Sequence, residues 1–145
     1  MDSPVIIEQS FPVPVSEVWE SIRDRHQMKE WYFDFAEFRP VQGFKFEFIS
    51  GPENGRQYLH KCEILEVAPE KKISYAWRYD GYEGNSLVTF TLQPVEEGTY
   101  LNLTHESLET FQSDVKDFAR ENFEAGWSHI IGTSLVHFLA SSKEQ

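Results

Sequence analysis

The sequence predicts an α+β fold in which a curved, six-stranded antiparallel sheet wraps around one long C-terminal helix. Two short helices are expected between the first and second strands. Over residues 115–139 the apolar side chains recur at steps of three and four, as on one face of a helix. Upstream, runs of alternating polarity are separated by short turns, which is typical of an antiparallel meander. Because strands and helices are segregated along the chain, a layered arrangement follows.

The first elements are a strand and two short helices. Residues 5–11 read as a strand because Ile6 and Ile7 are strong β-formers and prolines follow. Pro14 suits the first turn of a helix, and apolar residues follow it at helical spacing. A second short helix is expected over residues 27–32.

Five further strands are predicted by alternation between apolar and polar residues. The clearest run places Phe44, Phe46 and Phe48 on one side. Turn-forming segments rich in Gly, Pro and acidic residues separate the runs. The predicted strands cover residues 43–49, 58–67, 73–79, about 88–92 and about 101–105.

The C-terminal helix is the element that suggests a function. A helix of about 25 residues would extend about 37 Å at about 1.5 Å per residue. Only a broad, curved sheet can cover so long an apolar stripe, and we expect a gap between the two. Gly126, next to Trp127, is expected to let the helix approach the sheet closely. The stripe comprises Val115, Phe118, Ala119, Phe123, Trp127, Ile130, Ile131, Leu135, Phe138 and Leu139.

Composition restricts the class of protein. A chain of 145 residues is expected to form one domain, residues 1–145. The formal charge of −11 argues against nucleic acid or an anionic membrane as a partner. No apolar run reaches the about 20 residues that span a bilayer, and Met1-Asp2-Ser3-Pro4 does not resemble a secretion signal. With Cys62 as the single cysteine, we expect a soluble, cytoplasmic domain.

Several segments together resemble the heat-shock protein 90 ATPase activator homologue-like family. They are Pro14–Trp19, Cys62–Pro69, Ile73–Trp77, Gly98-Thr99 before the last strand, and Gly126-Trp127 in the helix. The resemblance implies the helix-grip fold of the START-like (SRPBCC, polyketide-cyclase-like) superfamily, with a cavity between sheet and helix. That superfamily includes lipid carriers, hormone receptors, cyclases and co-chaperones, so the resemblance implies a fold more than an activity.

Nine residues are expected to line the cavity, because the strand members share the face that meets the helix. Large aromatic rings with a few polar groups are the usual lining of a small-molecule site. The alternative for each ring is simple core packing. Trp31 is expected near the mouth, and Trp127 as a packing anchor. The nine are Trp31, Phe46, His60, Cys62, Tyr75, Trp77, Phe90, Phe123 and Trp127.

The polar members of this face could suggest metal binding or catalysis. His60 and Cys62 alternate on one strand, but His105 is expected three strands away, roughly 14 Å at about 4.8 Å per strand. No metal site is therefore predicted. His60 could act as a hydrogen-bonding or basic group with help from Tyr75, or be a core histidine bonded to a carbonyl. Cys62 is expected to be an inert buried thiol. His129 and His137 are expected to face solvent.

The preferred hypothesis is binding of a small hydrophobic or aromatic molecule, for transport, sequestration or sensing. No cofactor and no catalytic residue is assigned, and we expect a monomer or homodimer. The first alternative is an interaction protein that modulates a chaperone ATPase, with a role in stress response. The second is a cyclase-, dehydratase- or hydrolase-type enzyme that uses the same cavity.

Overall fold

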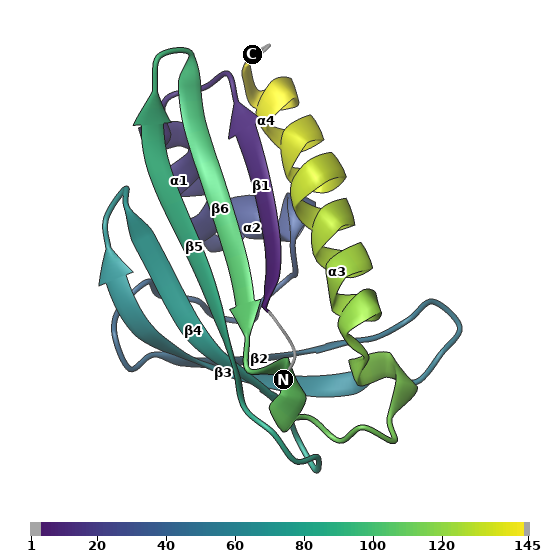
Figure 1. The fold of residues 1–145 in the computed structure, drawn as a ribbon. Coiled ribbons are helices and arrows are strands. Elements are labelled where there is room, and N and C mark those ends of the chain that lie inside the picture. The colour runs from purple at the N-terminus through teal and green to yellow at the C-terminus, as the bar shows by residue number, and fades with distance from the viewer. Residues whose placement is uncertain (1–3, 144–145) are drawn as a thin grey trace.

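The computed structural model describes residues 4–143 and contains one six-stranded antiparallel sheet. Its spatial order is β1-β6-β5-β4-β3-β2, so β2 to β6 form a meander and β1 pairs with the last strand. The segment Met1-Asp2-Ser3 lies outside the described residues. Figure 1 shows the strands curving together, with the helices on one side. The strands are β1 (Val5–Phe11), β2 (Lys45–Ser50), β3 (Tyr58–Ala68), β4 (Lys72–Tyr79), β5 (Ser86–Val95) and β6 (Gly98–Glu106).

The two short helices predicted between the first strands are present. They are α1 (Val15–Arg23) and α2 (Arg25–Trp31), with Pro14 in extended conformation immediately before α1. Helix α1 buries Val18, Trp19 and Ile22, which recur at helical spacing. The fold predicted from the sequence is therefore confirmed: an α+β layer with a curved sheet, two short helices and a long C-terminal helix.

The C-terminal helix begins at Arg120, so the predicted start at Val115 is wrong. The helical rod consists of α3 (Arg120–His129), a π-helical segment η3 (Ile130–Leu135) and α4 (Val136–Lys143). Ahead of it lie two short 3₁₀ turns, η1 (Leu108–Thr110) and η2 (Lys116–Phe118). The backbone of Ala119 is extended, with φ −70° and ψ 144°, which separates η2 from the rod. Phe118 is still buried, because the turn carries it onto the sheet.

The predicted alternation along the strands is confirmed by burial. On β6, Leu101, Leu103 and His105 are buried while their neighbours are partly exposed. The boundaries differ by a few residues. The second strand begins at Lys45, since Gly43 has φ +87° and turns the chain. The ladder between β3 and β4 shifts register between Ile64 and Glu66, so β3 carries a bulge.

The rod lies along the β1 side of the sheet and not across its middle. Helix α3 and η3 contact β1, and the far end of the rod contacts α1 (Figure 1). Ile131, Leu135 and Leu139 from the predicted stripe are 0%, 0% and 3% exposed. The apolar face of the C-terminal half of the rod is thus buried. The half of the sheet formed by β3 and β4 is separated from β1 by two other strands.

Gly98 is required where β6 begins beside the end of β1. Its φ is +149°, and a Cβ at this position would lie 2.0 Å from the carbonyl oxygen of Phe11. The next residue, Thr99, is fully buried and donates its hydroxyl to the carbonyl of Val13 at 2.8 Å. The Gly-Thr pair therefore fixes the connection between the first strand and the last.

Replacing Gly98 by alanine should lower the free energy of unfolding by roughly 3 kcal/mol or more, because a methyl group would collide with the β1 backbone. Gly81→Ala is the matched control. Gly81 also has a positive φ, +81°, but has no atom within 4 Å of an added Cβ. The Gly81→Ala substitution should lower the free energy of unfolding by only about 1 kcal/mol, the penalty for the backbone conformation alone. Urea denaturation of both variants measures the difference. Equal losses would show that the close approach is unimportant.

Candidate functional site

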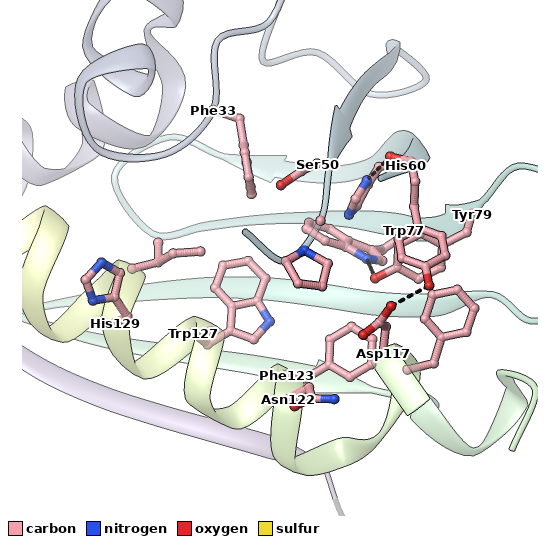
Figure 2. Close-up of a pocket in the computed structure, with 16 residues that line it drawn as sticks. Phe33, Ser50, His60, Trp77, Tyr79, Asp117, Asn122, Phe123, Trp127 and His129 are labelled. Carbon is pink, nitrogen blue, oxygen red and sulfur yellow. Dashed lines mark hydrogen bonds between the residues drawn. The ribbon is translucent and has the colours of Figure 1, made fainter. Parts of the chain in front are cut away.

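A pocket of about 490 Å³ opens between the rod and the β3–β4 half of the sheet. Figure 2 shows aromatic side chains from the strands facing those from α3 across this space. Seven of its sixteen lining residues are Phe, Tyr or Trp, and none is Lys or Arg. The lining consists of Phe33, Ser50, Gly51, Pro52, Tyr58, His60, Trp77, Tyr79, Asp117, Phe118, Asn122, Phe123, Gly126, Trp127, His129 and Ile130.

The pocket exists because the rod covers only part of the sheet. Helix α3 packs beside β1, whereas the floor of the pocket comes from β3 and β4, on the other half of the sheet. The β2–β3 loop supplies Gly51 and Pro52 to one side of the pocket. The η2 turn closes another side, where the ring of Phe118 stacks on Tyr79 with centroids 4.3 Å apart.

Four of the nine residues expected at the cavity lie in the wall of this pocket: His60, Trp77, Phe123 and Trp127. They come from β3, β4 and α3, elements distant in sequence, and the rings of Trp77 and Trp127 are 5.6 Å apart. The other five do not line it and are buried in the core: Trp31, Phe46, Cys62, Tyr75 and Phe90. Contact of any of the nine with a ligand stays a prediction.

Tyr32 explains why the pocket does not extend toward Tyr75 and Phe90. Its ring lies between sheet and rod, 6.3 Å from the ring of Phe90 and 5.9 Å from that of Trp127. Its hydroxyl pairs with that of Tyr75 at 2.6 Å. Burial raises the pKa of both phenols well above the ordinary value, so both remain protonated. This pair fills the part of the gap that the sequence assigned to a ligand.

Trp31 has a structural role in the short helices. Its indole N–H donates to the carbonyl of Ser21 at 2.9 Å, which ties α2 to α1. The place expected for Trp31, at the edge of the pocket, is taken by Phe33, which stacks on Phe48 with centroids 4.3 Å apart. Phe33 follows the end of α2, so helical spacing could not have pointed to it.

Sequence reasoning also missed Tyr79, which continues the face of Tyr75 and Trp77 at period two. The same alternation, extended by one step, would have found it. Tyr79 is the register partner of His60 across the β3–β4 ladder. The expected partnership of His60 with Tyr75 is therefore not assembled, because Tyr75 bonds Tyr32 and Tyr79 stands opposite His60. Asp117 was likewise missed, since it lies in a turn that was expected to be helical.

His60 is held in one tautomer. Its Nδ1 lies 3.0 Å from the carbonyl oxygen of Tyr58, and a carbonyl only accepts, so Nδ1 carries the hydrogen. The other nitrogen, Nε2, is then an acceptor, and no hydrogen-bond donor among the described residues pairs with it, since the backbone groups near the ring are carbonyls. Burial lowers the pKa of His60 to about 4, and the carbonyls of Tyr58 and Phe48 offset this only in part. The imidazole is therefore neutral at pH 7.

Tyr58 and Tyr79 are phenols of the pocket with different partners. The Tyr58 hydroxyl donates to the Asp117 carboxylate at 2.5 Å, which joins β3 to the η2 turn (Figure 2). Burial and this hydrogen bond raise the pKa of Tyr58 to about 12. The Tyr79 oxygen accepts the indole N–H of Trp77 at 2.9 Å, and burial raises its pKa as well. Both phenols are protonated at neutral pH.

A buried chain of hydrogen bonds fastens α3 to the sheet. The indole N–H of Trp127 donates to Nδ1 of His105 at 3.0 Å, so the hydrogen of His105 is on Nε2. Nε2 lies 2.7 Å from the Ser86 hydroxyl, which in turn donates to the carbonyl of Trp77 at 2.8 Å. Each donor has an acceptor, and burial lowers the pKa of His105 to about 3. Trp127 is therefore a packing anchor as well as a wall of the pocket.

The histidines and the cysteine do not form a metal site. The ring centroids of His60 and His105 are 5.1 and 5.5 Å from that of Trp77, and their strands, β3 and β6, are separated by β4 and β5. Within residues 4–143 no group of three His, Cys, Asp or Glu side chains is placed to hold an ion. Burial raises the pKa of the Cys62 thiol, which keeps it protonated and unreactive. His129 and His137 are exposed, and His129 stands at the edge of the pocket.

The expectation that Gly126 lets the helix approach the sheet closely is wrong. Gly126 is exposed, and an added Cβ would meet no atom within 4 Å, so it does not allow a close helix–sheet contact. Gly126 instead borders the pocket, where the absence of a side chain leaves the space open.

The curved sheet, the rod and the open pocket between them define a helix-grip protein of the START-like (SRPBCC, polyketide-cyclase-like) superfamily. The chain belongs to the family described as Activator of Hsp90 ATPase homolog 1-like protein, whose model matches residues 12–140. No curated protein matches the chain as a relative. None of the helices in residues 4–143 is long and apolar enough to cross a membrane.

Solved structures share the fold. Protein MLL2253 from Mesorhizobium loti is 26% identical with a TM-score of 0.74, and the match covers 96% of this chain and 98% of that one. CalU16 from Micromonospora echinospora is 23% identical with a TM-score of 0.73, covering 97% and 78%. DynU16, from the dynemicin biosynthetic locus, is 22% identical with a TM-score of 0.77, covering 98% of this chain and 49% of its own.

The two buried histidines predict that stability falls with acidification. In the unfolded chain each has a pKa near 6.5, but in the folded protein the values are about 4 and 3. The unfolded state therefore binds the extra protons, so stability is complete above pH 6.5 and is lost below it. Between pH 7.5 and 5 the loss should be about 2 kcal/mol for each histidine. Urea denaturation across this range should show it, and His60→Phe should remove about half of the slope. A flat profile would contradict both assignments.

Proposed function

We propose that this protein binds a small hydrophobic or aromatic molecule in the pocket between α3 and the β3–β4 half of the sheet. The observation that carries the proposal is the open volume of about 490 Å³ surrounded by aromatic rings. Ligand sites of proteins range over roughly 300–1,000 Å³ and combine apolar walls with a few polar groups. Carriage, sequestration or sensing of the molecule would follow from binding.

The rigidity of the walls supports this proposal. Trp127 is fixed by the hydrogen bond to His105, and Trp77 by its bond to Tyr79. Phe118 stacks on Tyr79, which itself lies in the middle of a strand. Walls that are held in place before binding lose little conformational entropy when a ligand enters, which favours affinity.

The alternatives draw less support from the structure. A chaperone-modulating role, suggested by the family name, would require a continuous exposed surface for a partner. Among the exposed large hydrophobic residues, Ile6 is on β1 and Ile49 on β2, at opposite edges of the sheet. An enzyme would require an acid–base pair in the pocket. Tyr75, the expected partner of His60, points to Tyr32 instead, and burial lowers the pKa of His60 to about 4, which makes it a weak base at neutral pH.

For this binding protein we also propose a cytoplasmic location. The one cysteine, Cys62, is a free and buried thiol. A thiol of this kind suits a reducing compartment, where disulfides are rare.

Gly126→Phe tests the pocket directly. An added side chain at this position meets no atom within 4 Å and borders the cavity, so the ring should occupy the space without straining the fold. Phenylalanine is also a better helix former than glycine, so stability should be retained. We expect a neutral fluorescent hydrophobic probe such as N-phenyl-1-naphthylamine to bind at least about 10-fold more weakly, a loss of about 1.4 kcal/mol.

Gly132→Phe provides the matched control. Gly132 is also an exposed glycine of the rod with open space around an added Cβ, but it does not line the pocket. Its variant should bind the probe as the parent does. Equal binding by the parent and both variants would place the probe elsewhere and contradict the proposal.

A further inference from the structure

Resting on the proposed function, we infer that the ligand is a neutral aromatic alcohol whose hydroxyl group bonds to both His60 and Tyr79. The hydroxyl would donate to Nε2 of His60 and accept from the phenol of Tyr79. A phenol is the simplest compound of this class. The inference goes beyond an apolar cavity because it specifies the polar group that the ligand carries.

His60 offers the pocket one hydrogen-bond acceptor, its Nε2 atom. Its Nδ1–H is committed to the carbonyl of Tyr58, so Nε2 has a lone pair and no hydrogen. No buried side-chain nitrogen or oxygen among residues 4–143 lacks a partner. Since Nε2 has no partner in the protein, it must be accessible from the pocket that His60 lines. A ligand that reaches Nε2 there must present a donor.

Tyr79 offers the pocket one hydrogen-bond donor, its hydroxyl group. Its oxygen accepts the indole N–H of Trp77, and an indole nitrogen cannot accept a hydrogen bond in return. Among the described residues the hydroxyl hydrogen of Tyr79 has no acceptor. Tyr79 lines the same pocket, and its ring centroid is 4.7 Å from that of His60. No hydrogen bond joins the two side chains directly, so a third group can stand between them.

A hydroxyl group is the simplest group that satisfies both sides, because it donates one hydrogen bond and accepts another. The bonds would then run in one direction: from the Trp77 indole to Tyr79, to the ligand, to His60 and on to the Tyr58 carbonyl. Each member of this chain would polarise the next. A methyl ether in the same place would leave Nε2 without a donor.

The charge of the lining excludes anionic ligands. None of the sixteen lining residues is Lys or Arg, and Asp117 supplies a carboxylate. Tyr58 already donates its hydroxyl to that carboxylate, so it offers no donor to a ligand. A ligand carboxylate or phosphate would be desolvated beside Asp117 with no cation to pair with. Neutral molecules are therefore preferred over fatty acids and phosphate esters.

Three biphenyls that differ only in the substituent at the 4-position test the inference by isothermal titration calorimetry at pH 7.5. They are 4-phenylphenol, its methyl ether 4-methoxybiphenyl, and biphenyl-4-carboxylate. The phenol should bind about 10- to 100-fold more tightly than the ether, since the ether accepts from Tyr79 but leaves the buried Nε2 of His60 without a donor. The carboxylate should bind more weakly than either.

Variants assign the preference to the two residues. In His60→Phe the ratio between phenol and ether should fall to about 3-fold or less. In Tyr79→Phe both ligands should bind more weakly by a similar factor, because the oxygen of each accepts from the Tyr79 hydroxyl. Tyr75→Phe is the control, because it removes a buried tyrosine hydroxyl of the same strand that lies outside the pocket wall. Its ratio should match that of the parent. Urea denaturation confirms that each variant is folded. The affinity ratio between phenol and ether on the unmodified protein does not depend on the variants.

The outcomes separate this inference from the proposed function. If the phenol and the ether bind equally, and Gly126→Phe abolishes both, the pocket binds aromatics but the hydroxyl selection is overturned. If the ratio persists in His60→Phe, or if Tyr79→Phe leaves both affinities unchanged, other groups contact the ligand oxygen and the assignment fails. If none of the biphenyls binds, the proposed function fails together with the inference.

Discussion

The attachment of Trp127 to the sheet determines the shape of this protein. A helix that covers only part of a curved sheet is held by few contacts at its uncovered end. Here the indole N–H of Trp127 bonds to His105, which continues through Ser86 to the β4 backbone. Inside a protein, satisfied polar chains of this kind fix one arrangement, because any shift would leave a buried group unpaired. Helix α3 is thereby fixed above an open space instead of collapsing onto β3 and β4.

The short helices determine where that space ends. After α2, Tyr32 enters the gap between sheet and rod and bonds to Tyr75. Beyond it, Ile131 and Leu135 are fully buried at the interface. The same gap is therefore solid core on one side of Tyr32 and pocket on the other. Phe33 and the β2–β3 loop then form the border of the pocket.

Local patterns predicted the elements of the fold, because period two and the spacing of apolar helix residues reflect burial directly. They could not predict where the rod begins. Phe118 is buried whether it stands on a helix or on a 3₁₀ turn, so hydrophobic spacing over residues 115–119 is the same in both cases. The pattern also identified Trp77 and His60 as inward-facing, which alternation alone decides.

Alternation did not decide which inward-facing residues meet the pocket. Tyr75 and Trp77 share a face, yet only Trp77 lines the cavity, because Tyr32 arrives from α2 to cover Tyr75. That contact joins residues 43 positions apart and depends on how the short helices dock. Tyr79 and Asp117 illustrate the same limit. Placing Tyr79 opposite His60 requires the register between β3 and β4, and placing Asp117 beside Tyr58 requires the path of the η2 turn.

The central claim is that the space between the rod and the β3–β4 half of the sheet accepts a ligand. Intermolecular nuclear Overhauser effects between 4-phenylphenol and the labelled protein test it most directly. The account predicts cross-peaks to ring protons of Trp77, Phe123 and Trp127, which surround the pocket. Cross-peaks confined to residues outside the pocket wall, such as the exposed Ile6 and Leu65, would contradict it.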